Sequence, residues 1–160
     1  MSDSVELRPI TAEDEAFLMR VYFSTREEEL RPVPWSDEQK AAFLEQQFRA
    51  QHDFYRQQFP DARFDLVLHY GQPVGRLYVD RREDEIRIID IALLTEARGK
   101  GLGGRLLEEL LAEAREAGKA VRIHVERNNP ALRLYHRLGF ESIEDQGVYY
   151  LMEWRPESDD

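Results

Sequence analysis

Cysteine is absent from the 160 residues of this sequence. Its absence excludes disulfide bonds, thiolate-ligated metals and a cysteine nucleophile. Histidine is also sparse, and no two of the four histidines have the short spacing of a metal-binding pair. The scattered histidines are His52, His69, His124 and His136. The sequence therefore predicts no metal site.

Long apolar runs are missing as well. No segment approaches the roughly 18 consecutive apolar residues that can span a membrane as a helix. The first residues, Met1 to Pro9, are polar and lack the apolar core of a secretory signal. These two absences predict a cytoplasmic protein with no membrane association.

The chain also lacks a basic excess. It has 22 lysines and arginines against 32 acidic residues, a formal net charge of −10. Nucleic-acid binding normally requires a positive field, so a nucleic-acid partner is disfavoured. The negative field would favour a cationic substrate, although it serves solubility equally well. With 42% hydrophobic residues, the chain has enough apolar surface for one globular domain.

Periodicity in the first part of the sequence predicts a strand followed by two helices. The strand covers Val5 to Ile10, and the first helix covers Ala12 to Glu29, preceded by the capping pair Thr11 and Asp14. Two prolines, Pro32 and Pro34, then interrupt the helical pattern. Ser36 is typical of a helix N-cap, and the second helix should extend from it to about Pro60.

From Phe64 onward, the pattern predicts six further strands and two more helices. Glu85 to Leu94 is an isoleucine-rich run typical of a central strand. The following helix has a leucine stripe and ends at Gly118. The other expected segments are strands at 64–70, 73–80, 120–125, 140–144 and 148–154 and a helix at 130–138. Together these elements predict a mixed α/β fold.

The junction between the central strand and the leucine-striped helix is rich in glycine. It reads Arg98-Gly99-Lys100-Gly101-Leu102-Gly103-Gly104. Glycine allows a tight turn and a close approach to a ligand, and the first N–H groups of a helix attract anions. The dinucleotide pattern G-x-G-x-x-G is absent here. The nucleotide phosphate loop also fails, because Arg105 and Leu106 follow where lysine and serine or threonine are needed.

The pattern R-x-x-G-x-G, formed by Arg98, Gly101 and Gly103, resembles the acetyl-CoA signature of the GNAT acetyltransferase superfamily. A second segment, 128–140, resembles that family's N-x-x-A-x-x-L-Y-x-x-x-G-F. Thr95 departs from the family, which commonly has proline there. The resemblance is good over 64–154. It implies a seven-stranded, mostly antiparallel sheet with about four helices, as one domain over 1–156 with a flexible acidic tail at 157–160.

The same resemblance implies an acetyl-CoA-dependent N-acetyltransferase that transfers the acetyl group directly to a primary amine. Acetyl-CoA would be the co-substrate, and no metal is implied. The implied cofactor-binding residues are Leu93, Leu94, Arg98, Gly99, Lys100, Gly101, Leu102, Gly103, Gly104, Asn128 and Tyr135. The Arg98 side chain would either contact phosphate or cap the loop. The alternative is a catalytically inactive acetyl-CoA-binding module of the same fold.

Two residues are predicted to act in catalysis. Tyr135 matches the family tyrosine near the CoA sulfur and would protonate the departing thiolate. Asp90 matches an acidic family position and would deprotonate the amine, which is otherwise charged at neutral pH. Glu85, on the same strand, is an alternative base, and a chain of water molecules is another.

The acceptor amine is not identified by the sequence. Trp35, Tyr22 and Tyr55 are candidates for lining its pocket, although the same aromatic residues suit a buried core. A small molecule and a peptide or protein amine both remain open as the acceptor. A homodimer is the other partner implied by the family, with the C-terminal strand as a candidate interface.

Overall fold

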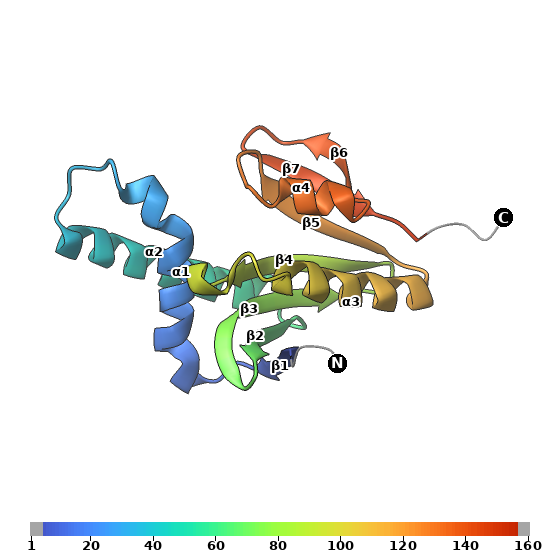
Figure 1. Cartoon of the computed structure of the whole chain (residues 1–160), viewed down its shortest axis with the longest axis horizontal. Helices are drawn as coiled ribbons and strands as arrows, with labels where there is room; N and C mark the ends of the chain where they lie inside the picture. Colours follow the sequence, from blue (N-terminus) through green and yellow to red (C-terminus); the bar gives the residue numbers. More distant parts are fainter. Residues whose placement is uncertain (1–4, 157–160) are drawn as a thin grey trace. The chain divides into compact units, whose positions relative to one another are not determined.

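A computed structural model describes residues 5–156 of the chain (Figure 1). The helices of the described residues are α1 (Glu15–Leu30), α2 (Asp37–Gln58), α3 (Leu102–Ala117) and α4 (Leu132–Arg137), with short 3₁₀ turns at Ala12–Asp14 and Thr95–Ala97. The strands are β1 (Val5–Pro9), β2 (Arg63–His69), β3 (Gln72–Arg81), β4 (Glu85–Leu93), β5 (Ala120–Glu126), β6 (Glu141–Asp145) and β7 (Tyr149–Trp154). The predicted tail at 157–160 lies outside the described residues.

The strands form one seven-stranded sheet in the order β1-β2-β3-β4-β5-β7-β6. β1 and β2 are antiparallel, as are β5 and β7 and β6 and β7. The pair β4 and β5 is parallel, and its ladder joins Glu85–Ile88 to Ala120–Ile123. The mixed, mostly antiparallel sheet and the element order confirm the fold class that the sequence predicts.

The described residues form two compact units. The first contains residues 5–78 and 90–100, and the second contains residues 79–89 and 101–156. The chain passes between the units inside β3, inside β4 and at the glycine-rich loop. A single domain over 1–156 stays a prediction.

The core of the first unit is formed by α1, α2 and β2. Leu18 and Tyr22 of α1 pack with Leu44 and Phe48 of α2, and all four are buried. The predicted cap of α2 is present, because Ser36 Oγ accepts a hydrogen bond from the Gln39 N–H at 3.1 Å. This cap satisfies one of the open N–H groups of the helix and sets where α2 begins after the proline-rich break.

The core of the second unit is formed by α3 on β5. The leucine stripe predicted for α3 is buried and consists of Leu102, Leu106, Leu107, Leu110, Leu111 and Ala114. The inward residues of β5 are Val121, Ile123 and Val125, which are also buried. α3 ends at Gly118, whose φ of 68° is a left-handed conformation that glycine adopts without steric cost.

Backbone hydrogen bonds outside the strand ladders mark both ends of β4. At its start, the Arg82 N–H bonds to the Glu85 carbonyl at 2.9 Å. After its end, the Leu94 N–H bonds to the Val74 carbonyl at 2.8 Å. The second bond ties the residue that follows β4 to β3.

Candidate functional site

The glycine-rich loop joins the 3₁₀ turn after β4 to the start of α3. The 3₁₀ turn, Thr95–Ala97, is closed by hydrogen bonds from the Ala97 N–H to the Leu94 carbonyl and from the Arg98 N–H to the Thr95 carbonyl. Gly99 and Gly101 then adopt φ values of 76° and 79°. Both lie in the left-handed region, so glycine is needed at these two positions to make the turn.

The loop leaves the start of α3 open. Gly101 is the N-cap residue of α3, and no side chain caps this end of the helix. A Cβ atom built on Gly99 or on Gly101 would meet no atom within 4 Å. Free N–H groups, the positive end of the helix dipole and open space around the backbone together suit an anion such as a pyrophosphate.

Arg98 makes the loop-capping contact that was one of its two predicted roles. Its Nε donates a hydrogen bond to the Leu93 carbonyl at 3.1 Å, and its side chain is exposed. This contact ties the loop to the end of β4. Lys100 is also exposed, so its charge is accessible to a phosphate without rearrangement of the fold.

α4 packs against the first turn of α3 in the second unit. A Cβ atom on Gly104 would lie 3.5 Å from Leu134 Cδ1, which is ordinary van der Waals contact. The next residue, Tyr135, is only 3% exposed, and its ring meets Phe140 edge to face at 5.5 Å. Tyr135, the predicted acid, therefore lies on α4, the helix that contacts the glycine-rich first turn of α3.

The two asparagines before α4 have different environments. Asn129 Oδ1 accepts a hydrogen bond from the Ala131 N–H at 2.8 Å. Asn129 therefore closes a local turn just before α4, whose N-cap residue Ala131 has no side-chain cap. Asn128, the predicted cofactor ligand, is exposed beside it.

Asp90 forms a buried ion pair with Arg76 of β3. Arg76 Nη2 lies 2.8 Å from Asp90 Oδ2, and the side chains are 3% and 15% exposed. Arg76 Nε lies 3.3 Å from Asp90 Oδ1, so both carboxylate oxygens are engaged. The Tyr55 hydroxyl donates to Asp90 Oδ2 at 3.2 Å, and Gln51 Oε1 accepts from Arg76 Nη2 at 2.9 Å. α2, β3 and β4 are thereby joined by one polar cluster.

Aromatic rings enclose the guanidinium of Arg76. Its central carbon lies 6.0 Å from the ring centre of Tyr22 and 5.1 Å from that of Tyr78. Two of the predicted acceptor residues, Tyr22 and Tyr55, therefore contact the Arg76–Asp90 pair. Arg76 was not predicted from the sequence, where its only signal is an arginine among the apolar residues in the middle of β3.

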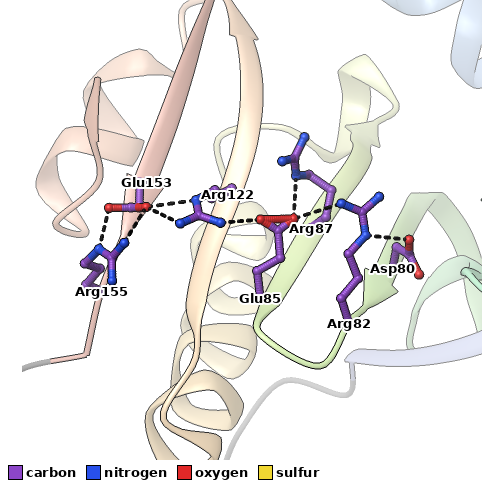
Figure 2. Close-up of polar contacts among 7 residues, drawn as sticks. All are labelled: Asp80, Arg82, Glu85, Arg87, Arg122, Glu153 and Arg155. Carbon is purple, nitrogen blue, oxygen red and sulfur yellow. Dashed lines mark hydrogen bonds and ion pairs between the residues drawn. The ribbon is translucent and has the colours of Figure 1, made fainter. Parts of the chain in front are cut away.

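Glu85, the alternative base, lies in a chain of charges within the second unit (Figure 2). Its carboxylate accepts hydrogen bonds from Arg82, Arg87 and Arg122 at 3.0, 3.2 and 2.5 Å. Arg122 also binds Glu153 of β7 at 2.8 Å. Burial raises the pKa of Glu85, but the bonds and charges of Arg122 and Arg87 outweigh it and hold the pKa below its ordinary value. A carboxylate held ionised in this way is a weak proton acceptor.

Trp35, the third predicted acceptor residue, is 42% exposed and meets Phe43 edge to face at 5.4 Å. Phe43 also lines a small hollow of 240 Å³ together with Tyr22. A larger groove of 490 Å³ lies in the first unit between α1 and the residues that follow β4. Its lining residues are Ala16, Met19, Arg20, Phe23, Ser24, Glu27, Leu94, Thr95 and Glu96.

This groove follows one stripe of α1, and none of the three predicted aromatic residues lines it. An ion pair between Arg20 and Glu96, with a 2.6 Å separation, joins its two walls. The helical spacing of Met19, Phe23 and Glu27 is the only sequence signal for it, and an amphipathic surface helix gives the same pattern.

Residues 5–156 contain neither a cluster of potential metal ligands nor a membrane-spanning helix. In that range no three histidine, aspartate or glutamate side chains gather in a way that could hold a metal ion. None of the helices there combines the length and the apolar character needed to cross a membrane.

The sequence of this chain is similar to those of known acetyltransferases. Residues 19–140 match the model of the acetyltransferase (GNAT) family. The [ribosomal protein bS18]-alanine N-acetyltransferase of Haemophilus influenzae is 32% identical over 85 residues, which are 52% of this chain and 58% of that protein. The chain thus aligns with little more than half the length of this curated relative.

Solved structures share the fold over nearly the whole chain. The PaiA N-acetyltransferase of Thermoplasma acidophilum, in complex with coenzyme A, superposes with a TM-score of 0.70 at 20% identity. The superposition covers 95% of this chain and 99% of that one. An acetyltransferase of Thermus thermophilus superposes with a TM-score of 0.69 at 22% identity, covering 95% and 97%. At these identities the likeness concerns the fold.

Proposed function

Because the chain belongs to the GNAT acetyltransferase family, we propose that it transfers the acetyl group of acetyl-CoA directly to a primary amine. The amine nitrogen attacks the thioester carbonyl, the carbon–sulfur bond breaks, and the CoA thiolate takes up a proton as the amine loses one. The sequence holds no cysteine to carry the acetyl group in between. The observation that carries the proposal is the open start of α3, framed by left-handed Gly99 and Gly101.

The loop residues from Arg98 to Gly104 would hold the pyrophosphate of acetyl-CoA, mainly through backbone N–H groups. Lys100 is exposed and would supply charge to a phosphate. The backbone of Leu93 and Leu94 would lie along the pantetheine arm. An N–H group near Leu93 would stabilise the oxyanion that forms when the amine attacks.

Tyr135 would protonate the leaving thiolate, and Asn128 would bind the cofactor through its exposed amide. Tyr135 is supported by its place on α4, which packs on the first turn of α3. A thiol has a pKa of about 8.5, so a proton supplied by the enzyme eases the departure of the sulfur.

Asp90 remains the carboxylate candidate for the base, but its ion pair favours a positioning role. The Asp90 carboxylate is the counter-charge of the buried Arg76 guanidinium, and loss of that charge is energetically costly. Water leading to solvent would then remove the proton from the amine. Asp90→Asn distinguishes the two roles, because loss of a base removes the acidic limb of the pH–rate profile, whereas loss of an anchor lowers the rate at every pH.

The groove along α1 is the region we propose for the entering acceptor. It is next to Leu94, Thr95 and Glu96, which directly precede the loop. Tyr22 and Tyr55 would act indirectly, because Tyr22 contacts Arg76 and Tyr55 binds Asp90. The curated relative is named for an alanine of ribosomal protein bS18, so peptide amines belong beside small amines in an acceptor screen.

The first experiment is calorimetric titration of acetyl-CoA into the wild type and Gly101→Glu. A Cβ atom at this position would meet no protein atom within 4 Å, and a glutamate adds a negative charge at the open helix start. We expect the wild type to bind and the variant to lose at least about 100-fold in affinity.

Gly118→Glu is the matched control. It introduces the same residue into the same helix, at a glycine with similar φ, but at the opposite end. It should bind acetyl-CoA like the wild type. A folded wild-type protein without affinity for acetyl-CoA would contradict the proposal. Binding without thiol release for any amine tested would favour the inactive module.

A further inference from the structure

Gly75 on β3 faces β4 at a distance that excludes every side chain. A Cβ atom on Gly75 would lie 2.3 Å from the Ala92 carbonyl oxygen, 2.7 Å from Leu93 Cδ2 and 3.0 Å from Leu93 Cα. Gly75 does not belong to the residues with positive φ. Its backbone would therefore accept any residue, and it is the neighbouring strand that requires glycine here.

A backbone hydrogen bond holds β3 and the end of β4 together next to the close approach. It runs from the Leu94 N–H to the Val74 carbonyl, and these two residues directly follow Leu93 and precede Gly75 in the chain. The backbone atoms that lie closest to Gly75 are Ala92 O and Leu93 Cα. Both belong to the peptide group between Ala92 and Leu93, and the N–H of this peptide group is the Leu93 N–H.

A second anchor holds the same stretch from its other end. Asp90 is bound through both oxygens by Arg76, the residue next to Gly75, and the guanidinium is nearly fully buried. Buried charge pairs with several partners have little freedom to move. The backbone from Asp90 to Leu93 is thus held by Arg76 at one end and by contact with Gly75 at the other.

We propose that Gly75 is a positioning residue that aims the Leu93 N–H at the carbonyl of the acetyl thioester. The inference rests on the proposed function, because it presumes that acetyl-CoA lies along this part of β4. Gly75 itself would touch neither acetyl-CoA nor the amine. Any side chain at position 75 would displace the Ala92–Leu93 peptide group and lengthen the hydrogen bond to the carbonyl oxygen.

The test uses Gly75→Ala with acetyl-CoA and CoA as probes, so that no acceptor has to be known. The infrared carbonyl band of bound acetyl-CoA, labelled with ¹³C at the carbonyl carbon, reports the hydrogen bond directly. In the wild type this band should lie below that of free acetyl-CoA, and in the variant it should return toward the free value. The preference for acetyl-CoA over CoA in calorimetry should fall about fivefold, as expected for one neutral hydrogen bond, while affinity for CoA stays within about twofold.

Gly71→Asn is the matched control, because it changes another glycine of the hairpin formed by β2 and β3. Gly71 has a φ of 78° and open space around it, and asparagine tolerates this conformation. The control should keep the wild-type carbonyl band and the preference for acetyl-CoA.

A wild-type carbonyl band in folded Gly75→Ala would overturn the inference, as would equal losses of affinity for acetyl-CoA and CoA. If Gly75→Ala does not fold, Gly75→Ala combined with Leu93→Ala is measured instead. That pair removes the contact with Leu93 Cδ2 and keeps the one with the Ala92 carbonyl. Failure of the proposed function would be visible separately, as absence of acetyl-CoA binding by the wild type.

Discussion

The ring and the hydroxyl of Tyr135 have different tasks. The ring is buried against Phe140 and belongs to the core of the second unit. The hydroxyl is the group that we propose as the proton donor to the CoA sulfur. Phenylalanine keeps the ring and removes the hydroxyl, so one substitution separates packing from chemistry.

For Tyr135→Phe we expect acetyl-CoA affinity within about threefold of wild type and a fall in turnover of about 10²-fold, at the lower end of the range for general acid catalysis. Turnover is measured as thiol release with an amine found active in the acceptor screen. Tyr149→Phe removes a hydroxyl from an exposed tyrosine of β7 and should leave turnover unchanged. Equal turnover in both variants would exclude Tyr135 as the acid.

At the scale of the elements, charged side chains connect strands that are distant in the sequence. In the second unit, the chain of charges passes from Glu153 on β7 through Arg122 on β5 to Glu85 on β4 (Figure 2). Arg82, from the turn after β3, joins it at Glu85 and also binds Asp80 at 3.0 Å. Because Glu85 is 4% exposed, removing its charge would leave several guanidinium groups without their common partner.

Glu85→Gln should therefore lower the free energy of unfolding by about 2 kcal/mol at pH 7, the scale of hydrogen bonds to charged groups. The pKa of Glu85 in the fold lies below its ordinary value. The stabilisation is thus complete above the unfolded pKa of about 4.3 and is lost as the pH falls through the lower folded pKa.

The measurement is urea unfolding of the wild type and Glu85→Gln between pH 7 and pH 3. The difference between the two proteins should shrink below about pH 4. Glu83→Gln removes one negative charge from the exposed turn beside it and should change stability by less than about 0.5 kcal/mol. A difference for Glu85→Gln that does not vary with pH would show that the carboxylate does not titrate as described.

At the scale of the whole molecule, acetyl-CoA should stabilise the fold by mass action. Binding to the folded state alone adds about 2.7 kcal/mol at a ligand concentration 100 times the dissociation constant. The thermal midpoint of the wild type and of Gly118→Glu should rise with acetyl-CoA concentration, while that of Gly101→Glu should not. A rise of equal size in Gly101→Glu would locate the binding site away from the loop.

Much of the architecture was predictable from local signals. Ser36 before an acidic turn, the prolines between the first two helices and the leucine stripe of α3 each report local backbone preferences, and the structure confirms the elements that they predict. The loop motif was readable for the same reason, because glycines with positive φ are required by the turn itself.

The environments of the functional side chains could not be predicted from local sequence, because they depend on residues far apart in the chain. Asp90 matched a base by its position, but its partner Arg76 and the rings of Tyr22 and Tyr78 come from other elements. The need for glycine at position 75 likewise comes from a neighbouring strand, since its own φ is ordinary. The sequence by itself determined the elements, the fold class and the loop, which follow from local conformational preference and periodicity. Only the tertiary structure decided which charges are neutralised and how closely β3 and β4 approach, because those are set by long-range packing.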